Sequence, residues 1–386
     1  TETRFDSLAL KENISISIAD ILSYNSSLFV KQYGRASMST VSFRGTSASH
    51  TQVLWNGMKI NSPMLGMTDF SMIPSFFMDG ASLLHGTSSL QSVSGGLGGA
   101  VLLNSETPDI QGLQLQYIQG FGSFLTADEF LKIDYGGKKF KSSTRVLLST
   151  SENEFKYVNM DKKEIRYDEN MNIVESWHPV ERYRSGAWRD FHAMQELGYT
   201  TDGGHVFSLS AWYMDSYRQL PQLTVDYGAD TDFINEQRES TFRSVASWKK
   251  NWDTSKAEIS AGYSTTGLDY DYARDKGDGN YVYMTKSRSR TETIYAKAAY
   301  ERYFGRKWLL TCNAAMHQHF VNSYDESIMV QGNEAEKVGY KASATEISAF
   351  VSLKWKPVKR AGLSVSLRED IFRSSFSPVI PAFNAD

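Results

Sequence analysis

The longest pattern in the sequence is an alternation of apolar and polar residues that begins near residue 110 and continues to the C-terminal end. Leu113, Leu115 and Tyr117 form one face of it, with Gln114 and Gln116 between them. Successive side chains of a strand point to opposite faces, so the alternation predicts half-buried strands. About eleven segments of roughly 7–12 residues fit, a length that suits tilted membrane strands. They lie at 113–118, 130–135, 145–150, 192–199, 205–214, 241–249, 257–264, 291–300, 308–320, 346–355 and 363–372.

The expected connections between these strands alternate in length. Short, turn-like connections lie at 136–139, 200–204, 251–255, 302–306 and 357–362. Long connections lie at 151–190, 215–240, 265–290 and 321–345, and at that end only 120–128 is short. Short turns at one end and long loops at the other are typical of outer-membrane barrels. The pattern predicts a mainly β fold with a large antiparallel transmembrane β-barrel. A soluble all-β binding or adhesion protein is the alternative.

Residues 1–108 have a different character. Ile18–Leu22 predicts a short amphipathic helix that reaches as far as Ser26, and Phe29–Tyr33 predicts a strand. Asn56 and Gly57 stand between two apolar runs, which indicates a hairpin with a type I′ turn. We therefore expect an α+β domain at 1–108 and barrel strands at 109–386.

The number of predicted strands is odd, whereas single-chain bacterial barrels normally have an even number. An open barrel would leave unpaired backbone groups in lipid, which is not viable. We therefore expect this chain to form the N-terminal half of a barrel. Roughly 260 further residues would complete a 22-stranded barrel, the class that holds a plug in its lumen.

Composition excludes several classes of function. Mean hydropathy is -0.41, and the apolar runs fall far short of the ~20 residues that a spanning helix needs. The net charge is -3 without a basic run, so nucleic acid is not an expected partner. Cys312 is the single cysteine, which excludes an internal disulfide and a Cys-based zinc site. No nucleophile elbow, zinc-protease or P-loop motif is present, so no enzyme is predicted.

Three ordered blocks in the N-terminal domain carry a family resemblance. They are Phe43–Gly45, the hairpin Val53–Ile60, and Gly86–Leu103 with its paired glycines. In order and spacing they resemble the plug of TonB-dependent receptors, although Asn56 stands where the family usually has Asp. No TonB box is recognisable before Phe5. The resemblance implies active import across the outer membrane, with membrane lipid and the TonB energy-transducing complex as partners.

A second resemblance concerns the cargo. Arg44–His50 reads Arg-Gly-Thr-Ser-Ala-Ser-His, which resembles the cobalamin receptors of this family. Trp55, Met58, Met64 and Met67 resemble the Bacteroidota type. The resemblance implies a corrinoid ligand and a surface lipoprotein cap as a further partner. A siderophore or glycan receptor of the same fold, and a receptor that only signals, remain alternatives.

The resemblance also implies positions for the functional residues. Arg44 and Gly45 are expected to couple plug and barrel, and an ordinary solvated arginine is the alternative for Arg44. Two loops at the plug apex are expected to contact substrate, because methionines, hydroxyls and amides suit a large amphipathic ligand. Ordinary surface loops are the alternative. The expected substrate-binding residues are Asn61, Ser62, Met64, Leu65, Met67, Ser89, Gln91 and Ser92.

No resident cofactor is expected, and calcium in the long connections is the main metal candidate. Asp226, Asp230 and Asp232 cluster in one long connection, and oxygen ligands suit calcium. Their spacing fits no tight calcium loop, so a solvated acidic loop is the alternative. His317 and His319 are two residues apart and therefore share one face of a strand. They are interpreted either as a metal-binding pair or as histidines that face the lumen of the barrel.

Overall fold

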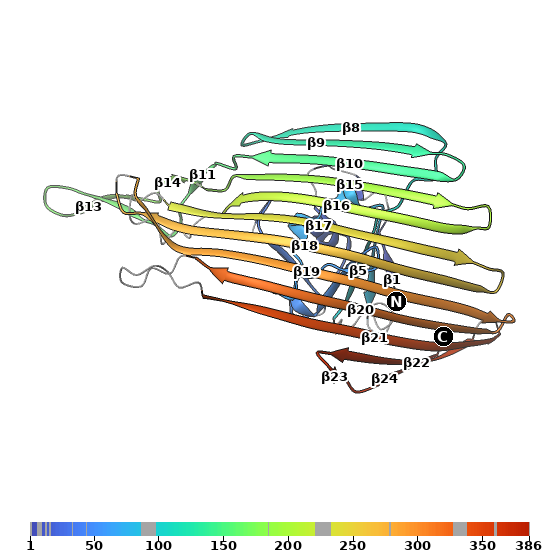
Figure 1. Cartoon of the computed structure of the whole chain (residues 1–386). Coiled ribbons are helices and arrows are strands. Elements are labelled where there is room, and N and C mark those ends of the chain that lie inside the picture. Colours follow the sequence, from blue (N-terminus) through green and yellow to red (C-terminus); the bar gives the residue numbers. More distant parts are fainter. Residues whose placement is uncertain are drawn as a thin grey trace.

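The computed structural model describes residues 2–5, 10–11, 14, 17–32, 34–43, 45–85, 98–183, 185–220, 233–277, 279–326, 338–358 and 361–385. A small N-terminal domain lies against one face of a large antiparallel sheet (Figure 1). Within the described ranges, none of the helices has the length and apolarity needed to cross a membrane. The fold is mainly β, as the alternation predicts.

The N-terminal domain is built around a five-stranded sheet in the order β1-β6-β7-β4-β5. Its strands are β1 (Glu2–Arg4), β4 (Thr51–Trp55), β5 (Met58–Lys59), β6 (Gly80–His85) and β7 (Gly99–Asn104). The strands β2 (Phe29–Gln32) and β3 (Ser39–Ser42) form a separate hairpin. The helical elements are α2 (Ile18–Asn25), η1 (Ala48–His50), η2 (Phe70–Met72) and η3 (Ser75–Phe77).

Two local predictions in this domain are confirmed, and each has a visible cause. Helix α2 starts at a capping box, in which the Ser17 hydroxyl accepts from the Asp20 backbone N–H and the Asp20 carboxylate accepts from the Ser17 backbone N–H. The turn between β4 and β5 has positive φ at both central residues, 48° at Asn56 and 88° at Gly57. Both values fit the predicted type I′ turn.

The large sheet contains all the strand segments that the alternation predicts, each hydrogen-bonded to its neighbour in sequence order. The long strands are β8 (Gly112–Gly122), β9 (Thr126–Gly136), β10 (Phe140–Ser151), β15 (Trp188–Thr200), β16 (His205–Gln219), β17 (Phe233–Asn251), β18 (Ser255–Asp275), β19 (Tyr281–Phe304), β20 (Trp308–Asp325), β21 (Val338–Val358) and β22 (Ala361–Phe372). Two short strands, β23 (Ser375–Phe376) and β24 (Ile380–Ala385), both pair with β22. The predicted short turns all join these strands at one end, the short-turn end.

The predicted strand lengths hold for β8, β9, β10 and β22, which have 11 or 12 residues, but they are too short for others: β18 has 21 residues and β19 has 24. The expected long connection 265–290 is mostly paired strand, which ends at Asp275 and resumes at Tyr281. Charged residues such as Asp271 and Arg288 interrupt the apolar pattern here, but the backbone pairing continues. Arg288 in β19 forms an ion pair with Asp271 in β18 at 2.8 Å across this extension.

The connection 151–190 contains the largest projection of the molecule. Its four short strands are β11 (Lys156–Val158), β12 (Glu164–Tyr167), β13 (Ile173–Trp177) and β14 (Val180–Arg182). The strands pair as β11 with β14 and β12 with β13, giving a ribbon that extends beyond the long-loop end of the sheet (Figure 1).

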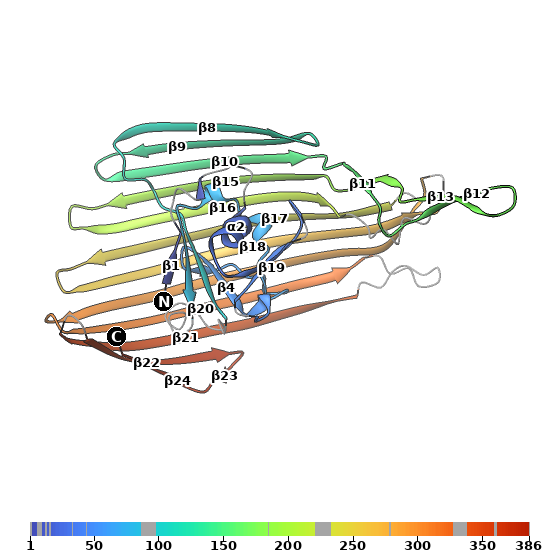
Figure 2. The same cartoon turned by 180° about the vertical axis from the view of Figure 1, so that it is seen from behind.

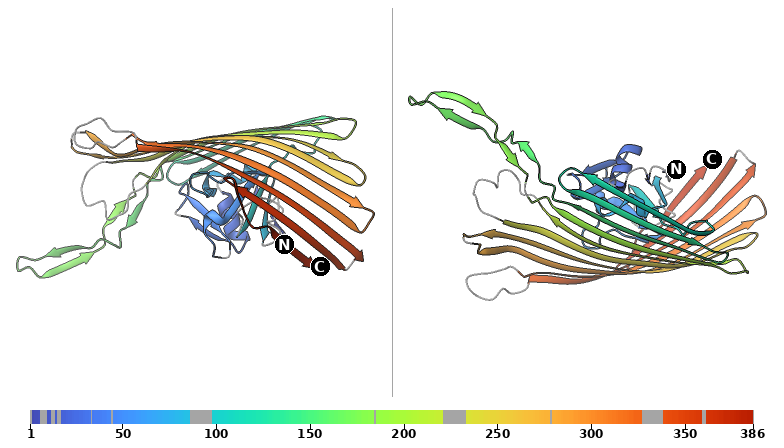
Figure 3. Two further views of the ribbon diagram at one scale, coloured as in Figure 1. Left: turned by 60° about the horizontal axis from the view of Figure 1, so that its bottom comes forward. Right: turned by 90° about the horizontal axis from the view of Figure 1, so that it is seen from above.

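The large sheet curves around the N-terminal domain, which lies on its concave side (Figures 2 and 3). The described strands do not close the curve, because no pairing joins β8 to β22, β23 or β24. The concave face buries polar and charged side chains, among them Asp128, Lys132, Arg145, Glu196, Arg218, His317 and His319. The convex face exposes large apolar side chains, among them Leu113, Leu115, Phe207, Leu209, Ile259, Ile294, Val365 and Leu367. This polarity is inside-out relative to a soluble sandwich and suits lipid on the convex side.

Aromatic contacts join the two parts into one core. Trp55 of β4 meets Trp212 of β16 edge to face, with ring centroids 5.6 Å apart. Phe77 of η3 contacts Phe130 of β9 at 6.2 Å. Both contacts belong to one buried apolar cluster, so the N-terminal domain is packed against the sheet.

Candidate functional site

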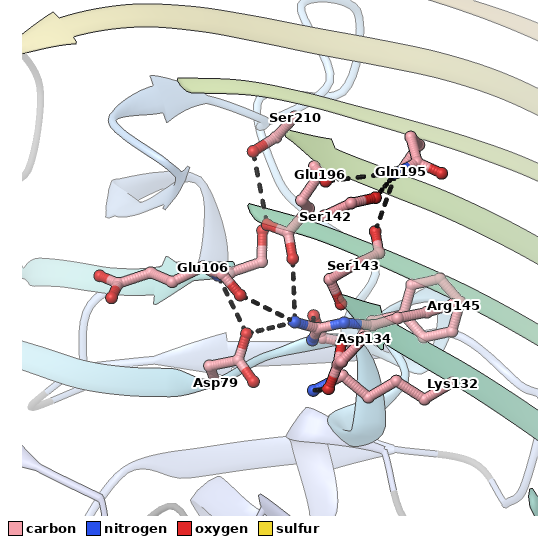
Figure 4. Close-up of polar contacts among 12 residues, drawn as sticks. Asp79, Glu106, Lys132, Asp134, Ser142, Ser143, Arg145, Gln195, Glu196 and Ser210 are labelled. Atoms are coloured by element: carbon pink, nitrogen blue, oxygen red, sulfur yellow. Dashed lines mark hydrogen bonds and ion pairs between the residues drawn. The ribbon is translucent and has the colours of Figure 1, made fainter. Parts of the chain in front are cut away.

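The closest polar contact between the N-terminal domain and the large sheet centres on Arg145 of β10 (Figure 4). Its side chain is fully buried. It donates to the carboxylate of Asp79, to the carbonyl of Phe77 at 2.7 Å and to the carbonyl of Glu106 at 3.3 Å. On the sheet it donates to Glu196 of β15 at 2.9 Å. Arg145 therefore ties the segment before β6 to two neighbouring strands.

The charges around Asp79 favour its ionised form. Burial raises the pKa of the Asp79 carboxyl, but the charge and hydrogen bond of Arg145 and the backbone N–H of Glu106 outweigh it. The pKa of Asp79 consequently lies below its ordinary value. Lys11 approaches the same carboxylate at 3.4 Å. Asp79 is thus shared between the large sheet and the N-terminal segment.

Among the described residues, three further ion pairs connect the N-terminal domain to other strands of the large sheet. Arg35, after β2, pairs with Asp128 of β9 at 2.6 Å. Lys59 of β5 pairs with Glu346 of β21 at 2.9 Å. Arg218 of β16 lies 3.7 Å from Asp69 and donates to the Ser71 hydroxyl at 2.8 Å. Together with Arg145–Asp79, these four pairs are called the anchor pairs below.

The first residues of the chain run antiparallel to the segment that carries Asp79. Their contacts, in order, are Glu2 with Leu84, Arg4 with Ser82, the Phe5 N–H with the Ala81 carbonyl, Lys11 with Asp79, Ser17 with Pro74, and the Ile18 N–H with the Ile73 carbonyl. Segment 69–79 therefore touches the N-terminal residues on one side. At its ends, through Asp69 and Asp79, it touches two arginines of the large sheet.

A cavity of about 90 Å³ lies between loop 61–69 and strands β17, β18 and β19. Its N-terminal-domain side is rich in methionine and largely apolar. The apolar residues are Met38, Ile60, Pro63, Met64, Leu65, Met67, Met72 and Ile73. Its sheet side is polar, with Glu239, Arg243, Ser264, Thr266, Ser289, Thr291 and Thr293. An amphipathic molecule would meet thioethers on one side and hydroxyls on the other. We call this space the apex cavity.

A larger cavity of about 480 Å³ separates α2 and the β2–β3 hairpin from strands β9, β10 and β15. Asp20, Gln32, Asp128, Asp190 and His192 are among its polar lining residues. The Arg35–Asp128 anchor pair crosses it, and the Arg35 guanidinium also lies 5.3 Å from the ring of Trp188. The domain and the sheet are thus less tightly packed here than around Trp55.

Comparisons with known proteins agree with this architecture. Residues 3–100 match the family described as TonB-dependent Receptor Plug Domain. The structure of the copper transporter OprC aligns with a TM-score of 0.67 at 16% identity, over 96% of this chain and 56% of that chain. The siderophore receptor PiuA from Acinetobacter baumannii aligns with a TM-score of 0.67 at 13% identity, over 100% of this chain and 60% of that chain. This chain has the plug domain and the fold of a TonB-dependent receptor.

Two curated proteins are similar to this chain in sequence. The vitamin B12 transporter BtuB of Photobacterium profundum is 25% identical over 309 residues, which are 72% of this chain and 50% of that protein. The vitamin B12 transporter BtuB of Vibrio vulnificus is 34% identical over 70 residues, 18% of this chain and 11% of that protein. This chain spans about half the length of the first of these relatives.

The apex cavity brings together the predicted plug residues that the structure describes, but Asn61 differs from the others. The Asn61 side chain is buried, accepts from the Val53 N–H at 2.8 Å and donates to the Thr51 carbonyl at 2.9 Å. Its amide therefore holds the base of the loop. Ser62, Met64, Leu65 and Met67 line the cavity, and their contact with substrate stays a prediction.

Several predicted residues lie outside the described residues. They are Arg44, Ser89, Gln91, Ser92, Asp226, Asp230 and Asp232. Gly45 is described, at φ 75° in the turn after β3, and its coupling role stays a prediction. His317 and His319 both face the plug, with their rings stacked 6.0 Å apart. The described residues contain no group of three or more His, Cys, Asp or Glu side chains that could hold a metal ion.

Sequence reasoning missed the anchor pairs and the polar wall of the apex cavity. The sequence feature that could have indicated them is a charged residue on the polar face of a predicted barrel strand, as at Arg145 and Glu196. A charge that faces the lumen needs a partner. The sequence does not name that partner, because Asp79 is 66 residues from Arg145.

Proposed function

We propose that the complete protein is a TonB-dependent importer of the outer membrane, and that its cargo is cobalamin or a related corrinoid. The apex cavity carries this proposal, because it joins the plug to the barrel wall on the side of the long loops. Its thioether side and its hydroxyl side together suit one edge of a large ligand that carries both apolar and polar groups. The sequence similarity to proteins named vitamin B12 transporters supports a corrinoid.

In this proposal the long-loop end faces the outside and the short-turn end faces the periplasm. Membrane lipid covers the convex face, where Leu115, Leu209 and Leu367 are exposed. That apolar face disfavours the alternative of a soluble binding or adhesion protein, which would expose it to water.

Import needs the plug to move, and the contacts suggest the order of events. The TonB complex pulls on the N-terminal segment, which lies along segment 69–79. Loss of the Lys11–Asp79 contact and of the Ile18–Ile73 hydrogen bond then frees that segment on one side. The anchor pairs at Arg145 and Arg218 keep its two ends on the barrel until they separate. The larger cavity beside α2 is where a path for the ligand opens most easily. No covalent chemistry is involved.

A surface lipoprotein cap is a further proposed partner. The β11–β14 ribbon projects from the long-loop end and exposes Met171, Ile173 and Trp177. Exposed apolar side chains on a projecting ribbon are typical of a protein-binding surface. Co-purification of a lipoprotein with the receptor, lost when residues 160–178 are deleted, would support this partner.

A siderophore or glycan receptor of the same fold is the second candidate for cargo. The ferric enterobactin receptor PfeA from Pseudomonas aeruginosa aligns with a TM-score of 0.68 at 13% identity, and such a likeness supports the fold without separating the cargoes. Calorimetry on the complete detergent-solubilised receptor tests the choice. Cyanocobalamin should bind tightly, while a ferric siderophore and an oligosaccharide should not. Binding of either control instead of cyanocobalamin would favour a siderophore or glycan as the cargo.

A further inference from the structure

The barrel wall of the apex cavity contains a cation without an ion pair. Arg243 of β17 lines the cavity beside loop 61–69. Among the described residues, its guanidinium forms no hydrogen bond and no ion pair, and its contact is with the ring of Trp212 at 5.0 Å. An arginine has five N–H donors. Leaving all five unused inside a partly enclosed cavity is costly unless a ligand or water takes them.

Trp212 fixes the position of this guanidinium. Arg243 and Trp212 are direct cross-strand partners on β17 and β16. The Trp212 ring also meets Trp55 of the plug edge to face, with centroids 5.6 Å apart. Stacking on an indole face holds the guanidinium plane and leaves its N–H edge available for a planar or tetrahedral anion. The arrangement also couples the position of Arg243 to that of the plug.

The remaining charges around the cavity are arranged so that an anion is favoured at one position. Lys59 and Asp69 also line it, but each is held in an anchor pair, with Glu346 and Arg218. Glu239 is on the same face of β17, four residues before Arg243. Four residues of strand separate the two backbones by about 13 Å. Glu239 attracts Arg243 from the long-loop side but forms no ion pair with it, so the cavity has a negative entrance and a positive floor.

The size of the cavity limits what can enter it. About 90 Å³ is the space of roughly three water molecules. A corrin ring does not fit, whereas a phosphate or carboxylate with its neighbouring atoms does. Ser264, the direct cross-strand partner of Arg243, also lines the cavity, and its hydroxyl can donate to a remaining oxygen of such a group. The cavity is therefore built for one polar group of a larger ligand.

We propose that Arg243 binds an anionic group of the imported ligand, and that this contact selects ligands with a phosphate or carboxylate on their edge. The proposal rests on the proposed function and adds to it. For a corrinoid, the group is the phosphate that links the lower nucleotide to the ring. Glu239, at the entrance, orients the ligand by repelling its anionic end and accepting from its amide N–H groups.

The test compares two corrinoids that differ in this group, on the complete detergent-solubilised receptor. Cyanocobalamin carries the phosphate and dicyanocobinamide lacks the whole nucleotide loop. Calorimetry is made with the wild type and with Arg243→Met, Arg243→Lys and Glu239→Gln. Arg243→Met should weaken cyanocobalamin about 10- to 100-fold, as expected for a charged hydrogen bond, and should leave dicyanocobinamide unchanged. Arg243→Lys should keep part of the affinity, and Glu239→Gln should not weaken cyanocobalamin.

Thermal unfolding of each variant shows whether the barrel is folded, and Arg243→Lys serves if Arg243→Met does not fold. Equal weakening of both corrinoids, or no weakening of either, would overturn the proposal and leave corrinoid import standing. If the folded wild type binds neither corrinoid, the cargo assignment fails. A ferric tris-catecholate, which is anionic, and a neutral ferric tris-hydroxamate then form the test pair. The proposal holds if Arg243→Met selectively weakens the anionic chelate, and it is overturned if no ligand shows this dependence.

Discussion

Asp79 of the plug and Arg145 of barrel strand β10 form a hydrogen-bonded ion pair inside the barrel, with the arginine fully buried (Figure 4). Buried pairs add little to stability, because desolvation offsets the attraction, but removing one partner is costly. A contact of this kind adds directional positioning to the apolar packing between the plug and the sheet. For the proposed import function, this combination suits a plug that is displaced and returned in each cycle.

Replacing Arg145 tests the anchor directly. Arg145→Met leaves Glu196 and Asp79 without their shared cation, and Glu196 is only 1% exposed. We expect a loss of about 3–5 kcal/mol in the free energy of unfolding, measured by denaturant on the complete receptor. Lys139→Met is the matched control. Its partner pair with Asp202 is exposed, at 48% and 84% of the two side chains, and should contribute at most about 1 kcal/mol. Equal effects of the two substitutions would contradict the anchor.

Asp79 should make plug docking sensitive to acid. Its pKa is held below the ordinary value of 3.8, so the carboxylate is stabilised by folding. Such a contribution is complete above the ordinary pKa and is lost as pH falls through the lowered one. The difference in melting temperature between the wild type and Asp79→Asn should be constant from pH 7 to about pH 5 and shrink below about pH 4. A difference that grows on acidification would mean that folding raises the pKa of Asp79 instead of lowering it.

The Asn61 side chain should stabilise the folded conformation of loop 61–69. Asn61→Ala leaves the buried Val53 N–H without its acceptor, which costs about 1–3 kcal/mol. Hydrogen exchange at the Val53 amide should accelerate, whereas Ser62→Ala, one residue later, should leave it unchanged. Unaltered exchange in Asn61→Ala would mean that another group accepts from Val53.

The pairing of β1 with β6 gives a test of plug release. Arg4 and Ser82 are direct cross-strand partners, at a separation that a disulfide can span. In a Cys312→Ser background, Arg4→Cys with Ser82→Cys should bind ligand with unchanged affinity when oxidised but should not import it. A reducing agent should restore import, and each single cysteine variant should import throughout. Import at the wild-type rate by the oxidised protein would show that β1 need not leave β6.

The strands of the large sheet were predictable because the two faces of each strand differ, apolar on the convex side and polar on the concave side. Leu209 and Phe207 mark the convex face, with serines between and beside them. Around Asp271 and Arg288 charged residues interrupt this contrast, so the sequence there resembles a loop although the backbone is paired. For this reason the sequence predicts the strands and places their outer ends too early.

The site was predictable only where it is local. Ser62, Met64 and Met67 follow a hairpin that the sequence identifies, and they reach the apex cavity. The opposite wall comes from three strands that fold back to loop 61–69 from more than 170 residues away, so Arg243 carries no local signal. The same holds for Lys59 and Glu346, which are 287 residues apart. The Asn61 amide has the right chemistry for ligand binding, but it is already hydrogen-bonded to the backbone of Val53 and Thr51.

Uptake of cobalt-labelled cyanocobalamin, by cells that lack their own corrinoid receptor and express the complete protein, tests the proposed function most directly. We expect energy-dependent accumulation that disappears when TonB is deleted. Excess unlabelled cyanocobalamin should suppress the accumulation, whereas a ferric siderophore should not. Surface binding without accumulation in energised cells, by a receptor shown to be folded in the outer membrane, would contradict import. Accumulation of the ferric siderophore instead would contradict the cargo.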